Sequence, residues 1–330
     1  MPFRNLAGRA ALCAGLFSTV CLTLAGTAAA ERIFVSNEKD NTITVLDGKT
    51  LSLVKTVAVG ARPRGIVLSS DGKALYICAS DADHIEVLDL NSLAVIRTLP
   101  SGPDPELFTL SPDGKVLYVA NENDNMVSVL NVAEGRIVTE IPVGLEPEGM
   151  GVSPDGKTLV NTSESTNMAH FIDTATHKVI ANVLVDNRPR FAEFTADGSQ
   201  VWVSSEIGGD VAIIDAAQHK IIKTIRFNVP GVTAEAIQAV GIALSRDGKL
   251  AFVALGPANR VAVIDRQSLE VKKYLLVGQR VWHLAFSPDQ QRLYTTNGVS
   301  NDMSVIDVAN LKVTKSVPVG VEPWGVAAAP

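Results

Sequence analysis

The sequence has few cysteines and no long tract of basic charge. Its 330 residues include three cysteines, and two of them, Cys13 and Cys21, lie within the first 30 residues. A chain without that segment keeps only Cys78, which lies in an apolar run, so we expect no internal disulfide and a buried, inert thiol. Acidic residues outnumber basic ones by 35 to 29. An acidic protein without basic tracts is a poor partner for nucleic acid, and we expect none to bind.

Recognised catalytic motifs are also missing. There is no glycine-flanked nucleophilic serine and no phosphate-binding loop. The five histidines, which have no metal-ligand spacing, are His84, His170, His177, His219 and His283. Only His283, at the start of an expected inner strand beside Trp282, is kept as a candidate acid, base or ligand. We expect no catalytic residue, no cofactor and no metal, and we interpret the acidic loops 37–41 and 121–125 as solvated turns rather than calcium loops.

The N-terminus has the pattern of a secretory signal. Arg4 and Arg9 precede an apolar stretch over 10–25, and three alanines end at Ala30. This pattern predicts a signal peptide over residues 1–30 with cleavage near Ala30. The mature protein is then expected in the periplasm, without membrane insertion and with a net charge of about −8.

One turn sequence is repeated throughout the remaining chain. The segment Ser-Pro-Asp-Gly-Lys at 111–115 suits a tight turn, because proline presets φ and glycine accepts positive φ. Equivalent aspartates recur every 42 residues, with a single interval of 50, at Asp71, Asp113, Asp155, Asp197, Asp247 and Asp289. Each turn is followed by β-branched and aromatic runs without helical period. The repeat therefore predicts four antiparallel strands per unit, as in β-propeller blades.

The two ends of the chain supply complementary halves of one unit. Residues 32–59 provide three outer strands without an inner one, and residues 324–329 provide an inner strand without a following turn. We therefore predict an all-β fold, a seven-bladed β-propeller forming a single domain over 31–330, with one blade shared between the ends. Closure hides the open sheet edges, and we expect a monomer.

Residues that recur in every unit are expected to be structural. One equivalent position at the end of the third strand is expected to cap a turn, and it holds Asp47, Asp89, Asn131, Asp173, Asp215, Asp265 and Asp307. A second position is expected in the core between blades, and it holds Phe34, Tyr76, Tyr118, Val160, Trp202, Phe252 and Tyr294.

Function is expected where the units differ, at the loops that lead into the innermost strands. We call this face of the propeller the top face, and these loops surround the mouth of the central channel. One position there reads Arg62, Asp104, Glu146, Arg188, Gln238, Arg280 and Glu322, and two residues later the series is Arg64, Glu106, Glu148, Arg190, Val240, Trp282 and Trp324. An insertion of eight residues near 228–235 lies on the same face and is expected either to carry function or to be a tolerated surface insertion.

Two interpretations of this mouth stay open. The arginines and tryptophans can form a pocket that stacks a planar or carbonyl compound and binds its carboxylates. Alternatively, the arginines and acids neutralise one another and close the channel. If the pocket exists, alanine at Arg190 or Trp282 should remove function with little change in melting temperature.

The repeated segments resemble a known family. Tyr-Val-Ala-Asn at 118–121, Phe-Val-Ser-Asn at 34–37 and Tyr-Thr-Thr-Asn at 294–297 are similar to the YVTN-type β-propeller repeat. The segments 62–65, 103–107, 146–150, 188–194 and 278–282, with 161–164 and 256–260, resemble the seven-repeat propellers associated with catabolism dependent on pyrroloquinoline quinone (PQQ). This resemblance implies a setting beside quinoprotein alcohol oxidation and an ABC transport system, in which PQQ belongs to the pathway rather than to this chain.

We therefore expect a non-catalytic binding or assembly protein. Its partner would be a quinoprotein dehydrogenase, a transporter component or a small carboxylate or carbonyl ligand at the mouth. The alternative is a lactonase-type hydrolase at the same mouth, with Glu148, Arg190 and His283 as its candidate residues.

Overall fold

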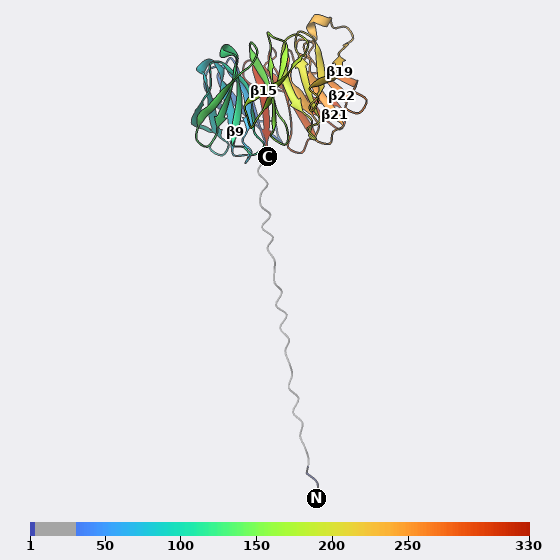
Figure 1. The fold of residues 1–330 in the computed structure, drawn as a ribbon. Helices are drawn as coiled ribbons and strands as arrows, with labels where there is room; N and C mark the ends of the chain where they lie inside the picture. The colour runs from blue at the N-terminus through green and yellow to red at the C-terminus, as the bar shows by residue number, and fades with distance from the viewer. Residues whose placement is uncertain (4–30) are drawn as a thin grey trace.

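The computed structural model describes residues 1–3 and 31–330, and the described chain is nearly all β-structure. Seven separate four-stranded antiparallel sheets stand side by side as propeller blades (Figure 1). This arrangement confirms the predicted fold. The predicted signal peptide and its cleavage position fall on 4–30, outside the described residues. Within the described part of the chain, no helix has the length and apolar character needed to cross a membrane.

The strands of each blade are called A to D from the innermost to the outermost. The A strands are β4 (Pro63–Leu68), β8 (Pro105–Leu110), β12 (Pro147–Val152), β16 (Pro189–Phe194), β20 (Ile242–Leu244), β24 (Val281–Phe286) and β28 (Pro323–Ala329). The B strands are β5 (Ala74–Ala79), β9 (Val116–Asn121), β13 (Thr158–Ser163), β17 (Gln200–Ser205), β21 (Leu250–Ala254), β25 (Arg292–Asn297) and β1 (Arg32–Asn37). The C strands are β6 (His84–Asp89), β10 (Met126–Asn131), β14 (Met168–Asp173), β18 (Asp210–Asp215), β22 (Arg260–Asp265), β26 (Asp302–Asp307) and β2 (Thr42–Asp47). The D strands are β7 (Ala94–Pro100), β11 (Arg136–Pro142), β15 (Lys178–Leu184), β19 (Lys220–Arg226), β23 (Glu270–Leu276), β27 (Lys312–Pro318) and β3 (Leu53–Ala58).

The seventh blade joins the two ends of the described chain. Strand β28 pairs antiparallel with β1, which places Phe34 opposite Ala327. Strands β2 and β3 complete the sheet outward. The predicted closure is therefore confirmed, and both edges of the N-terminal strand β1 are covered.

The repeated turns connect A and B strands on the bottom face. In the second blade, the Ser111 hydroxyl donates to Asp113, and Asp113 accepts the backbone N–H of Lys115 at 3.1 Å. The C-to-D turns use the same chemistry, since Asp47 accepts the N–H of Thr50 at 2.7 Å. The predicted capping role of these aspartates is confirmed.

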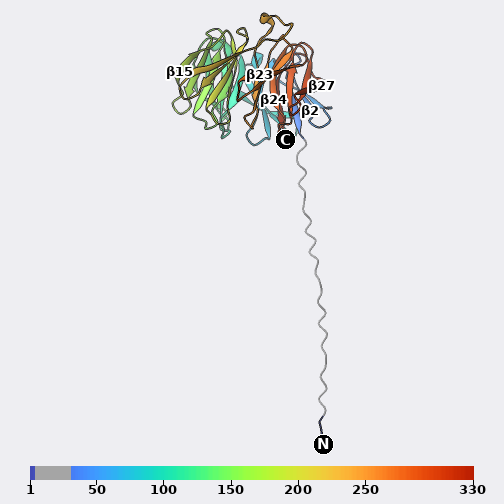
Figure 2. The same cartoon turned by 90° about the vertical axis from the view of Figure 1, so that its right-hand side faces the viewer.

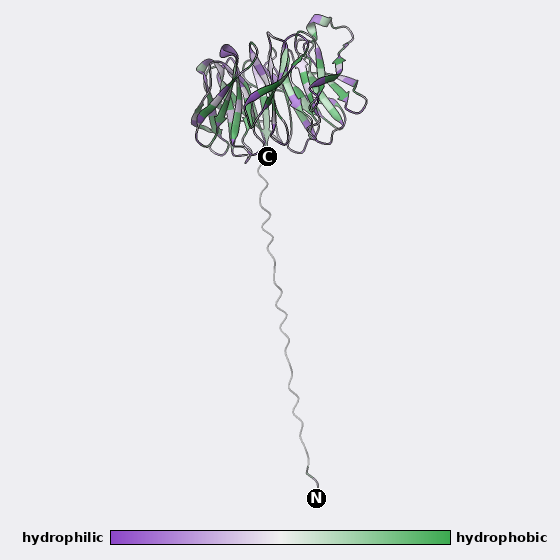
Figure 3. Cartoon of the chain, in the orientation of Figure 1, coloured by the Kyte–Doolittle hydropathy of each residue, from purple (hydrophilic) through white to green (hydrophobic). Residues whose placement is uncertain are grey.

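The core lies between the faces of neighbouring blades. The seven aromatic or valine positions predicted there are all buried, including Trp202 at 0% exposure. Figure 3 shows apolar residues along the strands and polar residues in the loops. Because each blade packs on two neighbours, the apolar clusters form a closed series around the channel.

Blade five is irregular. Its A strand β20 has three residues, and the preceding loop contains the short 3-10 helix η3 (Ala234–Ala236). This loop projects beyond the others at the top of Figures 1 and 2. Val229 and Ile237 are buried against the core of blades four and five, so the two ends of the insertion are packed while its tip is exposed.

Candidate functional site: the central channel and its top-face mouth

The backbone of the mouth is fixed by one arrangement of hydrogen bonds that is repeated in six blades. The residue directly before the A strand has a positive φ between 53° and 58° in six blades, and these residues are Arg62, Asp104, Glu146, Arg188, Arg280 and Glu322. The side chain of Asn41 in the preceding blade accepts the N–H of Arg62 at 2.9 Å, and the carbonyl of Arg62 accepts the N–H of Ser80 at 3.1 Å. The equivalent bonds recur around the ring. A left-handed conformation is costly for these residues, so the bonds on both sides fix where the charged side chains begin.

Arg190 is the centre of one group of ion pairs. Its side chain is 5% exposed and contacts Glu148 at 3.3 Å, Glu164, and Glu206 at 3.6 Å. Arg188 and Arg280 add further contacts to Glu164 and Glu206, each at 2.7 Å. The nearby carboxylates hold the pKa of Arg190 above its ordinary value despite the opposing effect of burial. A buried arginine with three carboxylate partners stabilises the structure of the mouth. Its removal is therefore expected to lower the stability of the protein, in contrast to the expectation from the sequence that the melting temperature would change little.

A second group joins the first two blades. Arg62 contacts Asp81 at 2.6 Å, Asp104, and Glu106 at 3.2 Å, while Arg64 also contacts Glu106. The Glu106 side chain is fully buried. The structure therefore brings most of the predicted mouth residues into two groups of ion pairs, as the self-neutralising interpretation described.

Acidic residues nevertheless outnumber arginines at the mouth. The loops between B and C strands contribute glutamates that sequence reasoning missed as members of the site, namely Glu38, Glu122, Glu164 and Glu206. They recur at one repeat position, and stepping through the B-to-C loops as well as the lead-in loops would have found them. Burial, and then Glu106 and Glu164, raise the pKa of Glu122 to about 7. Burial likewise raises the pKa of Glu148 above its usual range, although Arg190 opposes the shift.

The two tryptophans have different environments. Trp282 is half-buried, with the guanidinium of Arg280 4.3 Å from its ring centre. Trp324 is 1% exposed and packs against His283, with 4.1 Å between the ring centres and the ring planes tilted by 45°. Its ring is therefore covered, which differs from the expectation that both tryptophans open onto the mouth. Glu322 is exposed and makes no ion pair among the contacts of the described residues.

Below the charged mouth, small and large residues alternate around the channel. Leu107, Phe191 and His283 occupy alternate blades, and the positions between them are Gly65, Gly149, Gly241 and Gly325. A Cβ atom at Gly65 would lie 2.6 Å from the carbonyl oxygen of Glu106. The glycines therefore let neighbouring A strands approach closely, while the three larger side chains narrow the channel beneath the charged mouth.

A cavity of about 200 Å³ lies against this layer and extends toward the bottom face. Its lining combines the apolar side chains of Phe108, Met150 and Phe191 with polar groups, of which His283 and Glu193 are ionisable. Burial raises the pKa of Glu193 to about 7. Burial, and then the charges of Arg190 and Arg64, lower the pKa of His283 to about 3, so His283 is neutral at pH 7.

Comparisons with known proteins give the same architecture. Residues 1–132 match the family model described as a YNCE-like beta-propeller. No curated protein matches the chain. Among solved structures, hydrazine synthase of Kuenenia stuttgartiensis is 24% identical, with a TM-score of 0.75 over 84% of this chain and 92% of that one. The periplasmic gluconolactonase of Pseudomonas aeruginosa is 19% identical, with a TM-score of 0.77 over 92% of this chain and 99% of that one.

A third structure, the dihydro-heme d1 dehydrogenase NirN, is 17% identical with a TM-score of 0.66, and the match covers 90% of this chain and 74% of that one. These identities are low, and the proteins have different activities, so the likeness concerns the fold alone. The family match covers less than half of the chain, and together with the repeats and the seven closed blades it fits a β-propeller of the YVTN type.

Proposed function

We propose that this propeller is a non-catalytic binding protein that takes a small carbonyl or hydroxyl compound in its central channel. The cavity of about 200 Å³ carries this proposal, because it combines apolar side chains with three polar ones, Thr109, Glu193 and His283. A few polar groups within an apolar pocket are typical of small-molecule sites.

The ion pairs of the mouth arginines favour a neutral ligand. All five mouth arginines contact carboxylates, namely Arg62, Arg64, Arg188, Arg190 and Arg280. A ligand carboxylate would have to compete with these internal partners. A carbonyl or hydroxyl compound needs only hydrogen bonds from the cavity, and it is therefore preferred over the carboxylate.

The biological setting follows from the resemblance in sequence. The chain would act in the periplasm beside a PQQ-dependent alcohol oxidation, with a quinoprotein dehydrogenase or an ABC transporter component as its partner. The Pseudomonas neighbour is named as a periplasmic enzyme, which agrees with this location. PQQ would remain with the dehydrogenase.

Affinity purification from the source organism grown on an alcohol tests the proposal. Mass spectrometry would identify each protein and small molecule that co-purifies with the tagged chain. We expect a carbonyl or hydroxyl metabolite, together with a dehydrogenase or transporter component. Recovery of neither from alcohol-grown cells would contradict the proposal.

Lactone hydrolysis is the second candidate, and the Glu193 carboxyl favours it. With its pKa raised to about 7, this group is suited to proton transfer at neutral pH. The fold is shared with a gluconolactonase. If the chain hydrolyses a lactone such as gluconolactone, Glu193→Gln should lower kcat by roughly 10²–10⁴-fold. Absence of turnover by the wild-type protein would remove this candidate.

A further inference from the structure

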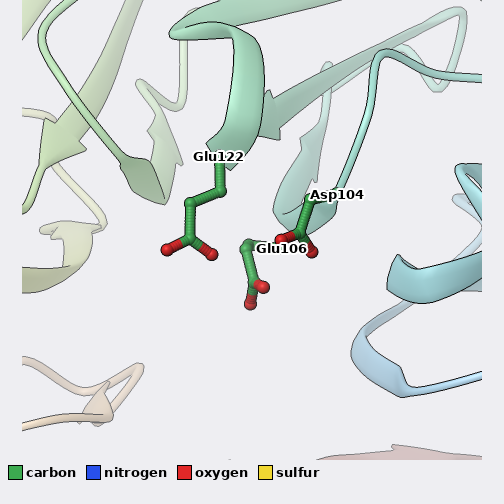
Figure 4. Close-up of side chains that lie close together, drawn as sticks. All are labelled: Asp104, Glu106 and Glu122. Carbon is green, nitrogen blue, oxygen red and sulfur yellow. The ribbon is translucent and has the colours of Figure 1, made fainter.

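The channel is closed toward its top-face mouth. The repeat position of Arg64 follows the lead-in residues, and five of its seven side chains are between 0% and 4% exposed, namely Glu106, Glu148, Arg190, Val240 and Trp324. Asp104, Glu106 and Glu122 lie close together here, with carboxylate oxygens within 4.8 Å of one another (Figure 4). Arg62 and Arg64 both pair with Glu106. A neutral organic molecule that entered from this side would have to separate buried ion pairs.

The bottom end of the channel is open and apolar. Near the end of each A strand, one repeat position holds only apolar residues, and six of the seven are partly exposed. We call these six residues the lower opening, and they are Leu68, Leu110, Val152, Leu244, Phe286 and Ala328. Because the A strands are the innermost strands, the lower opening surrounds the bottom of the channel. Such a surface favours the entry of a compound with an apolar part.

The cavity connects these two different ends. Among its lining residues, Leu107 and His283 are buried beneath the mouth, whereas Val67, Thr109 and Glu193, further along their strands, are partly exposed. Its volume is about 200 Å³. An apolar cavity of about 150 Å³ in another protein holds benzene. A substituted benzene ring or a short alkyl chain is therefore of suitable size.

Two buried ring nitrogens at the upper end of the cavity have no hydrogen-bond partner among the described residues. They are Nε2 of His283 and Nε1 of Trp324, and both side chains line the cavity. The indole N–H can only donate, and a neutral imidazole nitrogen donates or accepts according to its tautomer. A hydroxyl group can accept from the indole and pair with either tautomer. Proteins rarely leave buried polar atoms unpaired, so these nitrogens point to a polar group of a ligand.

We infer that the channel binds a small alcohol that enters through the lower opening, with its hydroxyl group toward His283 and Trp324 and its alkyl or aromatic part toward the bottom face. This inference rests on the proposed binding function and specifies its ligand. Thr109 and Glu193 lie along the route and offer further hydrogen bonds. A sugar or another polyol fits poorly, because its outer hydroxyl groups would lie against the apolar residues of the lower opening.

Calorimetric titration of benzyl alcohol, 1-hexanol and glycerol into the purified protein tests the ligand class. We expect one site per chain and a dissociation constant for benzyl alcohol or 1-hexanol that is lower than that of glycerol by about tenfold or more, because glycerol has no apolar part to bury. Benzoate should bind more weakly than benzyl alcohol, since its carboxylate would lose its hydration. Binding of glycerol as tight as that of the alcohols, or no binding of either alcohol, would overturn the inference.

Two variants locate the entrance. Leu110→Arg places a long charged side chain at the lower opening, where its guanidinium can extend into water. The matched control, Leu145→Arg, adds the same side chain on the top face, where Leu145 is 53% exposed. In stopped-flow tryptophan fluorescence, Leu110→Arg should lower the association rate constant of benzyl alcohol by about tenfold, and Leu145→Arg should leave it unchanged.

Circular dichroism would show that both variants are folded, and Ala328→Arg takes the place of Leu110→Arg if that variant does not fold. A wild-type association rate in the variant of the lower opening, or slowing by Leu145→Arg alone, would overturn entry from the bottom face. The affinity purification described above separates this inference from the proposed function. A polyol recovered from the channel would support the proposed function and contradict the inference, whereas an alcohol with an apolar part would support both.

Discussion

The bottom-face turns and the channel use the same acidic side chains in opposite ways. On the bottom face, each aspartate accepts hydrogen bonds from its own turn, and the Ser111 hydroxyl and Lys115 N–H lower the pKa of Asp113 to about 2. In the channel, burial raises the pKa of Glu193 to about 7. A carboxylate that accepts hydrogen bonds from its own turn stabilises that turn in each repeat. A carboxyl group that is buried without a hydrogen-bond donor has a raised pKa and is available to bind a ligand or transfer a proton.

The position of each acid in the repeat explains this difference. Turn aspartates recur in almost every blade because each turn presents the same backbone donors. The mouth and channel residues change from blade to blade, since seven identical acids or arginines there would repel one another. The following predictions separate the two regions, beginning with the strand that runs through both.

Deletion of residues 324–330 should have the largest effect. It removes nearly all of β28, exposes the inner edge of β1 and uncovers side chains such as Phe34, at roughly 1–3 kcal/mol for each large apolar group. We expect loss of cooperative folding or a fall in melting temperature above 10 °C, measured by circular dichroism. Removal of Pro330 alone is the control. An unchanged melt of the longer deletion would contradict the closure.

Arg190→Met should be the most destabilising substitution at the mouth. It leaves Glu148, Glu164 and Glu206 buried without their shared cation, at a cost of about 3–5 kcal/mol. The matched control is Arg136→Met, because Arg136 is 63% exposed on its side chain and pairs with the exposed Glu134, so a loss of no more than about 1 kcal/mol is expected. Equal losses in urea denaturation would mean that the buried network has no special role.

Glu193→Gln should change how stability depends on pH. The pKa of Glu193 is higher in the folded protein than in the unfolded chain, so its protonated form favours folding and this contribution is lost as pH rises from about 4.5 to 7. The variant lacks that loss and should gain on the order of 1–3 kcal/mol relative to the wild type above pH 7. Parallel stability curves for the two proteins from pH 4.5 to 8 would refute this.

Asp113→Asn should have the smallest effect and the opposite sign. Its folded pKa is lowered, so its contribution to stability is present above about pH 4 and is lost as pH falls through 2. The variant should be slightly less stable than the wild type at pH 7, and the difference should vanish near pH 2. A difference that grew toward low pH would contradict the assigned role of the turn.

The sequence predicts the architecture well because each repeat contains the same turn residues and the same pattern of apolar strand residues. The turn at 111–115 and the aspartates such as Asp47 depend on neighbours two to five residues away, and both are confirmed. The series of lead-in residues also locates the mouth and most of its charged groups. These features follow from local chemistry and a constant period.

Other features depend on contacts between different blades, and the sequence of a single repeat does not predict them. Trp324 is covered because His283 and Arg64, from the two neighbouring blades, lie against it. The channel cavity results from the sizes of side chains that six of the seven blades contribute to its lining. Burial of Glu193 is likewise a property of the closed channel, since its neighbours in sequence give no sign of it.

Native mass spectrometry of the protein from alcohol-grown cells most directly tests the claim that the channel cavity is a binding site. The wild type would be compared with Thr109→Phe, which fills the cavity from a lining position and leaves the mouth arginines in place. The account predicts a bound small molecule on the wild type and its loss from Thr109→Phe, with both proteins folded. A ligand retained equally by both proteins, or absent from the wild type, would contradict it.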